Sequence, residues 1–315
     1  MDPVQERVLY CTMSYPAYID TLKSGKLERL AESLKASLSE CRLCPHSCGV
    51  NRLRGETGYC VAGAEAEIAS YGPHFGEEPP LVGRGGSGTI FFSHCTLRCV
   101  FCQNFEISRG HGQQVSENEL AQIMLSLEKR GCHNINLVTP THFLPSIIAA
   151  LCIAAEKGLN VPVVYNISGY EDHRILAKLS GVVDIYLPDC KYTDADVGKR
   201  LSDVSDYPQR ALDALREMHQ QVGDLETNRQ GVAKRGVIIR HLVLPGGLAG
   251  SEKFFAFVAR ELSPHCAVNI MDQYHPAHIA YRFPPVDRCL LPKEYEDSLR
   301  TAKRCGLFLR KELLH

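Results

Sequence analysis

The sequence has almost no net charge and no run of lysine or arginine. Its 315 residues include 35 basic and 36 acidic side chains, for a net charge of -1, and the isoelectric point is near 6.9. This balance provides no long-range positive field, and binding to nucleic acid or to an anionic membrane would need a local basic patch that is missing here. We therefore expect neither kind of partner.

The sequence also lacks a long apolar run and a signal-peptide pattern. The N-terminal stretch MDPVQERVLY has no basic region followed by an apolar one. The longest apolar stretch, IIAALCIAA at 147–155, is too short to span a bilayer. These absences predict a cytoplasmic protein without a membrane segment.

Cysteine, in contrast, is abundant, with 14 residues in the chain. Disulfides are typical of small secreted chains, whereas this chain is large and 44% hydrophobic, enough to fill a core without cross-links. Metal binding is therefore the better explanation. Half of the cysteines fall into two clusters, Cys41/Cys44/Cys48/Cys60 and Cys95/Cys99/Cys102.

The rest of the chain alternates apolar runs with helical patterns. One helix, at 116–131, begins with a capping box formed by Ser116 and Glu119. Strands that are almost continuously apolar and are followed by helices indicate parallel pairing with both faces covered. Strands are expected at 89–93, 133–140, 161–168, 181–187, 235–244 and 267–271, and further helices at 18–39, 145–158, 193–222, 251–262 and 292–306.

The glycine-rich turn of a doubly wound nucleotide-binding fold is missing after the first strand. The stretch GRGGSG at 83–88 precedes that strand instead and is expected to be an approach loop. Six βα units favour an α/β fold of the partial (β/α)6 barrel type. We expect an N-terminal helical cap (1–40), a cysteine-rich metal-binding segment with the approach loop (41–87) and the barrel (88–315).

Three cysteines directly follow the first strand of the expected barrel, where barrel enzymes place their chemistry. Cys95, Cys99 and Cys102 have the spacing C-x3-C-x2-C. A [4Fe-4S] cube with four protein ligands is closed, whereas three thiolates leave one iron open, and an unfilled position also distinguishes catalytic from structural zinc. The alternatives are a zinc site completed by His94 or His111, or three unligated thiols.

This motif, with an aromatic residue before its third cysteine, resembles the signature of the radical S-adenosylmethionine (SAM) superfamily. Over roughly residues 41–291 the chain is similar to the branch related to pyruvate formate-lyase-activating enzymes. Within that branch it resembles homologues with an N-terminal cysteine cluster. The similar segments are CRLCPHSCGVNR, HFGEEPPL, GTIFFSHCTLRCVFCQN, NINLVTPTH, VVYNISGY, DIYLPDCKY, RHLVLPG and NIMDQYHP.

The resemblance implies a reaction and its cofactors. Cys95, Cys99 and Cys102 would hold a [4Fe-4S] cluster, and the amino and carboxylate groups of SAM would chelate its fourth iron. The reduced cluster would cleave SAM to methionine and a 5′-deoxyadenosyl radical, which abstracts hydrogen from the substrate. A reductant such as flavodoxin or ferredoxin is the implied partner.

The resemblance also assigns charged residues at two strand ends. Lys191 would pair with the SAM carboxylate, Asp189 would bind the substrate side or a cation, and Arg240 would contact SAM. A charged pair that merely caps a strand end is the alternative for Asp189 and Lys191. An arginine within an apolar strand is costly to bury without an anionic partner, which favours a ligand role for Arg240.

The chain departs from many relatives in lacking the Gly-Gly-Glu that receives the SAM amino group. Thr139, Thr141 and His142 stand at that point and can accept hydrogen bonds from an ammonium. At the next strand end, Asn166 and Ser168 are expected to bind the ribose or the methionine carboxylate. Three residues at the end of the last strand are expected on the active-site face, namely Gln273, Tyr274 and His275, with a purely structural histidine as the alternative for His275.

The N-terminal cluster has the spacing C-x2-C-x3-C-x11-C. Four thiols within twenty residues can close a zinc or an iron-sulfur site, and the sequence does not decide between them. A closed site cannot bind SAM. Its role would be structural, or the transfer of electrons to the cluster at Cys95.

Three functions compete at this point. The first is a radical SAM activase that takes a hydrogen from a glycine of a glycyl radical enzyme. The second is a radical SAM enzyme that acts on a small molecule or a peptide. The third, a non-catalytic iron-sulfur or zinc scaffold, is least favoured because residues that would face SAM recur at several strand ends.

Overall fold

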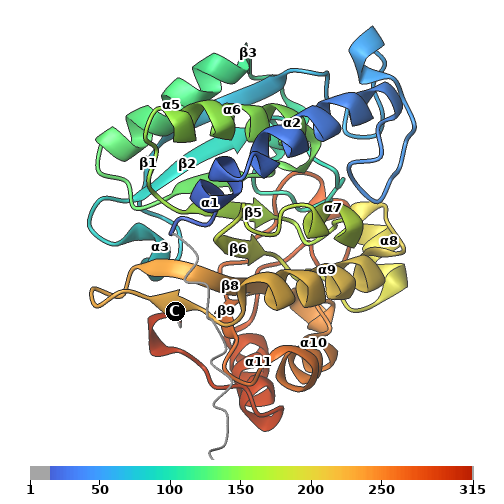
Figure 1. Ribbon diagram of the computed structural model, residues 1–315. Helices are drawn as coiled ribbons and strands as arrows, with labels where there is room; N and C mark the ends of the chain where they lie inside the picture. The colour runs from blue at the N-terminus through green and yellow to red at the C-terminus, as the bar shows by residue number, and fades with distance from the viewer. Residues whose placement is uncertain (1–14, 314–315) are drawn as a thin grey trace, which may run out of the picture.

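The computed structural model describes residues 15–313 and is built on a nine-stranded sheet (Figure 1). All six expected strands are present, and each is parallel to its neighbours in the order β2-β4-β5-β6-β8-β9. Strand β2 pairs on its other side with β1, so the barrel is open. The predicted partial (β/α) barrel is confirmed. The strands are β2 (Ser87–Phe92), β4 (Ile135–Val138), β5 (Val163–Ile167), β6 (Ile185–Pro188), β8 (Ala233–Leu242) and β9 (Ala267–Met271).

These strands are apolar because both of their faces are covered. Every residue of β5, β6 and β9 is buried, as expected where helices pack outside a parallel sheet. The covering helices form two groups, with α5 and α6 together and α9, α10 and α11 on the other side (Figure 1). Their bounds are α5 (Glu117–Lys129), α6 (Leu144–Glu156), α9 (Tyr207–Val222), α10 (Ser251–Phe257) and α11 (Pro292–Arg304).

Local signals in the sequence predict some helix ends correctly and fail to predict others. The capping box of α5 is confirmed, because the Ser116 N–H donates to Glu119 Oε2 at 2.8 Å and the Glu119 N–H donates to Ser116 Oγ at 3.3 Å. The prediction of a single helix at 193–222 is wrong. It divides into α8 (Ala195–Ser202) and α9, because Asp203 at φ 62° turns the chain out of the helix.

Three strands were not expected, and all are antiparallel additions to the barrel. β1 (Ala66–His74) pairs with β2, β3 (Gln113–Val115) pairs with β1, and β7 (Glu226–Thr227) pairs with β8. The short helices are α3 (Pro79–Val82), α4 (Phe105–Arg109) and α7 (His173–Ala177). No helix within residues 15–313 combines the length and the apolar character that crossing a membrane requires.

The described part of the expected N-terminal cap consists of α1 (Tyr18–Lys23) and α2 (Lys26–Ala36). The Tyr18 hydroxyl is within 3.0 Å of the carbonyls of both Leu159 and Val161. Helix α2 lies along α6 in Figure 1. These helices therefore cover the outside of the barrel. Residues 1–14 of the expected cap lie outside the described residues.

Candidate active site

The three-cysteine loop leaves the barrel at the C-terminal end of β2. His94, immediately before Cys95, has φ 68° and turns the chain as the strand ends. Three of the residues between the cysteines, Leu97, Val100 and Phe101, are apolar and are buried in a cluster with tyrosines from the following units. These residues anchor the loop, while Cys95, Cys99 and Cys102 all line one pocket.

Polar groups lie near all three sulfurs. Cys99 Sγ is 3.0 Å from Ser202 Oγ, and Cys102 Sγ is 3.5 Å from Ser108 Oγ. The Leu97 N–H donates to Cys95 Sγ at 3.4 Å. Hydrogen bonds to sulfur are a normal feature of thiolates that hold iron-sulfur clusters. The donor set therefore fits such a cluster.

Burial and mutual repulsion oppose ionisation of these thiols. Burial, with the neighbouring Cys99, raises the pKa of Cys95 to about 12. Burial also raises the pKa of Cys99, although the Lys191 charge acts in the opposite direction. Because thiols must lose their protons to bind metal, a bound cluster would replace these protons.

The two histidines considered as a fourth ligand both pair with Glu67, although His94 also lines the pocket of the three cysteines. His94 Nε2 is 3.3 Å from Glu67 Oε2, and His111 Nδ1 is 3.7 Å from Glu67 Oε1. Among residues 15–313, the groups whose ligand atoms gather within 4.8 Å include Glu67/His94/His111 but none with Cys95, Cys99 or Cys102. The geometry therefore does not support a zinc site completed by either histidine.

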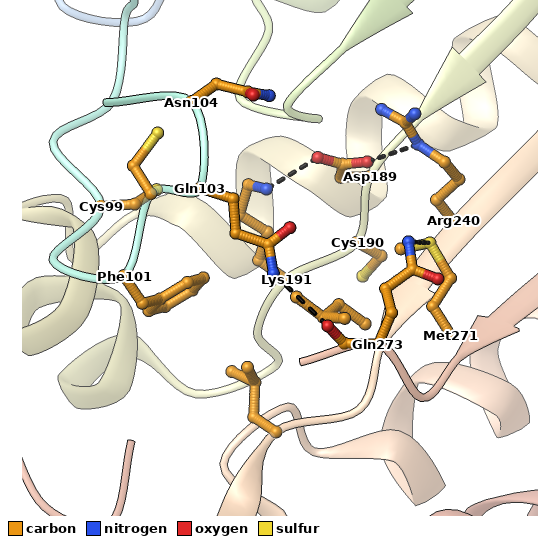
Figure 2. Close-up of a pocket in the computed structure, with 13 residues that line it drawn as sticks. Cys99, Phe101, Gln103, Asn104, Asp189, Cys190, Lys191, Arg240, Met271 and Gln273 are labelled. Atoms are coloured by element: carbon orange, nitrogen blue, oxygen red, sulfur yellow. Dashed lines mark hydrogen bonds and ion pairs between the residues drawn. The ribbon is translucent and has the colours of Figure 1, made fainter. Parts of the chain in front are cut away.

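A larger pocket of about 960 Å³ opens beside the cysteine loop (Figure 2). It shares Cys99 and Cys102 with the pocket that holds all three cysteines. Asp189, Lys191 and Arg240 also line both spaces. The cysteine loop and the ends of β6 and β8 therefore surround one continuous site.

Asp189 joins the two cations of this site. Its carboxylate accepts hydrogen bonds from Lys191 Nζ at 2.7 Å and from Arg240 Nε at 2.8 Å (Figure 2). Burial opposes its ionisation, but the Arg240 and Lys191 charges outweigh that effect and lower its pKa. The same attraction raises the pKa of Lys191 against the effect of burial. All three groups are therefore charged, and this trio places two cations and one anion beside the cysteines.

Arg240 also contacts Asn166, which the sequence analysis named, and Glu77, which it did not. Its Nη2 donates to Asn166 Oδ1 at 2.7 Å, and its Nη1 lies 3.7 Å from Glu77 Oε2. Glu77 comes from the segment between β1 and α3, and burial raises its pKa to about 7 although Arg240 opposes the shift. The segment HFGEEPPL has no periodic pattern that could have predicted this long-range contact.

Of the other residues expected to contact SAM, some line the pocket of the three cysteines and some do not. Thr139, Asn166 and Ser168 line the pocket of the three cysteines. Thr141 and His142 are buried away from it. Thr141 Oγ1 donates to Glu171 Oε1 at 2.7 Å, and His142 Nε2 lies 2.7 Å from the Ser93 carbonyl. Thr139 has φ 57°, so the chain turns sharply where β4 ends. After this turn, the side chains of Thr141 and His142 face the protein interior.

At the end of β9, Gln273 and its neighbours have different surroundings. Gln273 lines the larger pocket. The Tyr274 hydroxyl donates to the Val286 carbonyl at 2.6 Å and its ring packs edge-on against Phe101, so it supports the cysteine loop. His275 Nδ1 is 3.3 Å from Gln103 Nε2 at the exposed side.

The N-terminal cysteines line a separate small cavity together with His142.

Comparison with known proteins agrees with this site. Residues 89–232 match the Radical SAM superfamily. The chain is 34% identical over 302 residues to the uncharacterized protein MJ0674 of Methanocaldococcus jannaschii, covering 92% of this chain and 82% of that protein.

Two solved structures show more distant similarity. Methylornithine synthase (PylB) has a TM-score of 0.45 and 14% identity over 92% of this chain and 73% of its own. TYW1 with a lysine-pyruvate adduct has a TM-score of 0.43 and 12% identity over 69% of this chain and 72% of its own. The matching domain begins within β2 and includes the whole three-cysteine loop. The chain therefore belongs to the radical SAM superfamily, whose domain implies a [4Fe-4S] cluster and bound SAM.

Proposed function

We propose that this radical SAM enzyme is a cytoplasmic activase that abstracts hydrogen from a peptide segment of a partner protein, with a glycine of a glycyl radical enzyme as its target. The lining of the larger pocket carries this proposal. Among residues 15–313, the charged side chains that line it are Asp189, Lys191 and Arg240. The remaining wall is aliphatic, aromatic or uncharged polar, and includes Leu242, Leu244, Met271, Gln103 and Gln273.

A neutral wall of this kind suits a peptide backbone better than a charged metabolite. Gln103 Nε2 donates to the Gln273 backbone carbonyl at 3.4 Å, so the two residues lie next to each other in the pocket lining (Figure 2). Side-chain amides both donate and accept hydrogen bonds, as do the amide groups of a peptide. The aliphatic side chains can exclude water around a glycine that carries no side chain of its own.

The residues of the smaller pocket fit the implied cofactors. Cys95, Cys99 and Cys102 would hold the [4Fe-4S] cluster. Once held there, the cluster and SAM would supply one-electron reductive cleavage of the sulfur–C5′ bond and hydrogen abstraction from the substrate, with a reduced flavodoxin or ferredoxin as the source of the electron.

The chain's own charges would orient SAM. The Lys191 and Arg240 cations suit the SAM carboxylate, because a charge-assisted hydrogen bond is stronger than a neutral one. Thr139, Asn166 and Ser168 offer uncharged acceptors on the same wall. Asp189 holds both cations in place through its two hydrogen bonds.

The cysteines outside these pockets support a reducing compartment. Every cysteine within residues 15–313 is free of a disulfide. Free thiols in such number are typical of the cytoplasm.

Deuterium transfer tests the proposed target. A glycyl radical enzyme labelled with α-deuterated glycine would be incubated with this protein, SAM and dithionite. We expect deuterium in 5′-deoxyadenosine and a glycyl radical signal in electron paramagnetic resonance (EPR) spectra. A partner with alanine at the radical glycine is the control. The proposal would be overturned if 5′-deoxyadenosine formed with protium only and the labelled partner developed no radical.

A further inference from the structure

The four N-terminal cysteines surround one small cavity that the activity described above does not use. Cys41, Cys44, Cys48 and Cys60 all line it, so the four thiols face one common space. Two hydrogen bonds, from the Cys41 N–H to the Val50 carbonyl at 2.9 Å and from the Gly49 N–H to the Cys41 carbonyl at 2.9 Å, fold the first three cysteines into a tight turn.

A buried positive charge faces this cavity. Arg52 lines it and is only 2% exposed, and Arg52 Nη1 lies 3.7 Å from Cys41 Sγ. Its other partners are uncharged: the carbonyls of Gly63 and His142, and the Phe143 ring, whose centroid lies 6.0 Å from Arg52 Cζ. Within residues 15–313, no carboxylate lies within 4.0 Å of its guanidinium. Because a guanidinium stays charged and is costly to bury alone, the cavity calls for an anionic occupant.

The loop is also shaped around its sulfurs. A Cβ on Gly58 would lie 2.7 Å from Cys48 Sγ, so only glycine fits there. The Tyr59 N–H donates to Cys48 Sγ at 3.4 Å. Together with Arg52, this gives the sulfurs donors from both the backbone and a cation, as iron-sulfur thiolates commonly have.

The spacing of the sulfurs distinguishes iron-sulfur from zinc. Zinc–sulfur bonds of about 2.3 Å in a tetrahedron place the sulfurs about 3.8 Å apart. In the described part of the chain, these cysteines form no group whose ligand atoms lie within 4.8 Å of one another. No three of them therefore approach one another as closely as zinc requires, whereas an iron-sulfur cube, with iron and sulfide between its thiolates, holds them farther apart.

From these observations we infer that Cys41, Cys44, Cys48 and Cys60 hold a second, closed [4Fe-4S] cluster whose negative charge is balanced by Arg52. The site lies directly against the catalytic loop. His46 Nε2 is 2.8 Å from the Thr96 carbonyl, next to Cys95, and Arg98 Nη2 donates to the Tyr59 carbonyl at 3.0 Å. The two cysteine loops are thus held together by hydrogen bonds.

Metal analysis of a variant without the first cluster tests this inference independently of SAM chemistry. The triple variant C95S/C99S/C102S, purified without oxygen and reconstituted with iron and sulfide, should contain about four iron atoms per chain and no zinc. Its reduced form should give a [4Fe-4S] EPR signal that SAM does not alter. The intact protein should contain about eight iron atoms per chain.

A second variant tests the inference even if the triple variant does not fold. C48S changes the exposed cysteine of the cavity and should lower the iron content of the otherwise intact protein from about eight to about four. C305S changes a cysteine outside both clusters and should leave the iron content unchanged. One zinc per chain in the purified protein, or a triple variant that binds no iron while C48S retains the wild-type content, would overturn the inference.

Discussion

Arg240 connects more polar groups of the site than any other single residue described above. Its guanidinium group is hydrogen-bonded to Asp189 and to Asn166 and lies near Glu77, so it links three separate segments of the chain. Lysine cannot reproduce this planar arrangement, although it keeps the charge. The geometry of Arg240, rather than its charge alone, therefore matters for the site.

The variant R240K should bind SAM about tenfold to a hundredfold more weakly, since a hydrogen bond to a charged group contributes about 1.5–3 kcal/mol. Equilibrium dialysis with labelled SAM measures this. R235K, at the other end of β8, is the matched control, because Arg235 donates to the backbone carbonyls of Gln221 and Val222 and should not influence SAM. Equal SAM affinity of R240K and the wild type would contradict the proposed contact.

Asp184 is a buried carboxylate far from the pocket. It accepts hydrogen bonds from the N–H groups of Ala17 at 2.8 Å and Val163 at 3.0 Å, and so ties the start of the N-terminal helices to β5. Burial raises its pKa from 3.8 to about 6, although these hydrogen bonds oppose the shift. The folded state therefore holds its proton more tightly than the unfolded state does.

This shift predicts a pH dependence of stability. Between about pH 4 and 6 the unfolding free energy contributed by Asp184 should fall as pH rises, by at most about 1.4 kcal/mol per pH unit, and it should be constant above that window. The variant D184N should lack this slope. Urea unfolding of both proteins at several pH values measures the difference, and parallel curves for the two proteins would show that the shift is absent.

At the scale of elements, helix α5 begins at the most explicit local signal in the sequence. The reciprocal bonds between Ser116 and Glu119 satisfy two N–H groups that otherwise have no partner within a helix. We expect S116A to lower the unfolding free energy by about 1 kcal/mol. S126A, at an exposed position within the same helix, should change stability little. Thermal unfolding compares the two variants, and an equal effect would argue against the cap.

The elements that the sequence predicted well are those with a strong repeating pattern. Continuous apolar runs identified all six parallel strands, because those strands are buried on both faces. Strand β1 was missed because the second half of Ala66–His74 is largely exposed and carries polar residues. The break between α8 and α9 was missed because it depends on one residue, Asp203, in a left-handed conformation that no periodicity reveals.

Site residues that lie at strand ends could be predicted from the sequence. Site residues whose positions depend on a turn or on a segment distant in sequence could not. Asp189, Lys191 and Arg240 follow or end strands, and they meet because parallel strands finish at one edge. The left-handed turn at Thr139 directs Thr141 and His142 inward instead. Glu77 reaches Arg240 from outside the strands of the barrel, and its neighbours in sequence give no sign of that contact.

At the scale of the whole molecule, the open barrel brings two cysteine loops and several strand ends to one region. The loop after β2 carries three thiols, and β6 and β8 supply the charges beside them. The N-terminal segment closes against that loop through His46 and Arg98. SAM cleavage should therefore depend on the intact chain and on Cys95, Cys99 and Cys102 together.

The most direct test is the release of 5′-deoxyadenosine from SAM by the protein reconstituted without oxygen and reduced with dithionite. The wild type and C305S should both release it, and C99S should release none, because one of three thiolates is then missing. Chromatography of the products measures the nucleoside. Wild-type protein that carries an intact cluster, yet neither releases 5′-deoxyadenosine nor changes its EPR spectrum when SAM is added, would contradict the account.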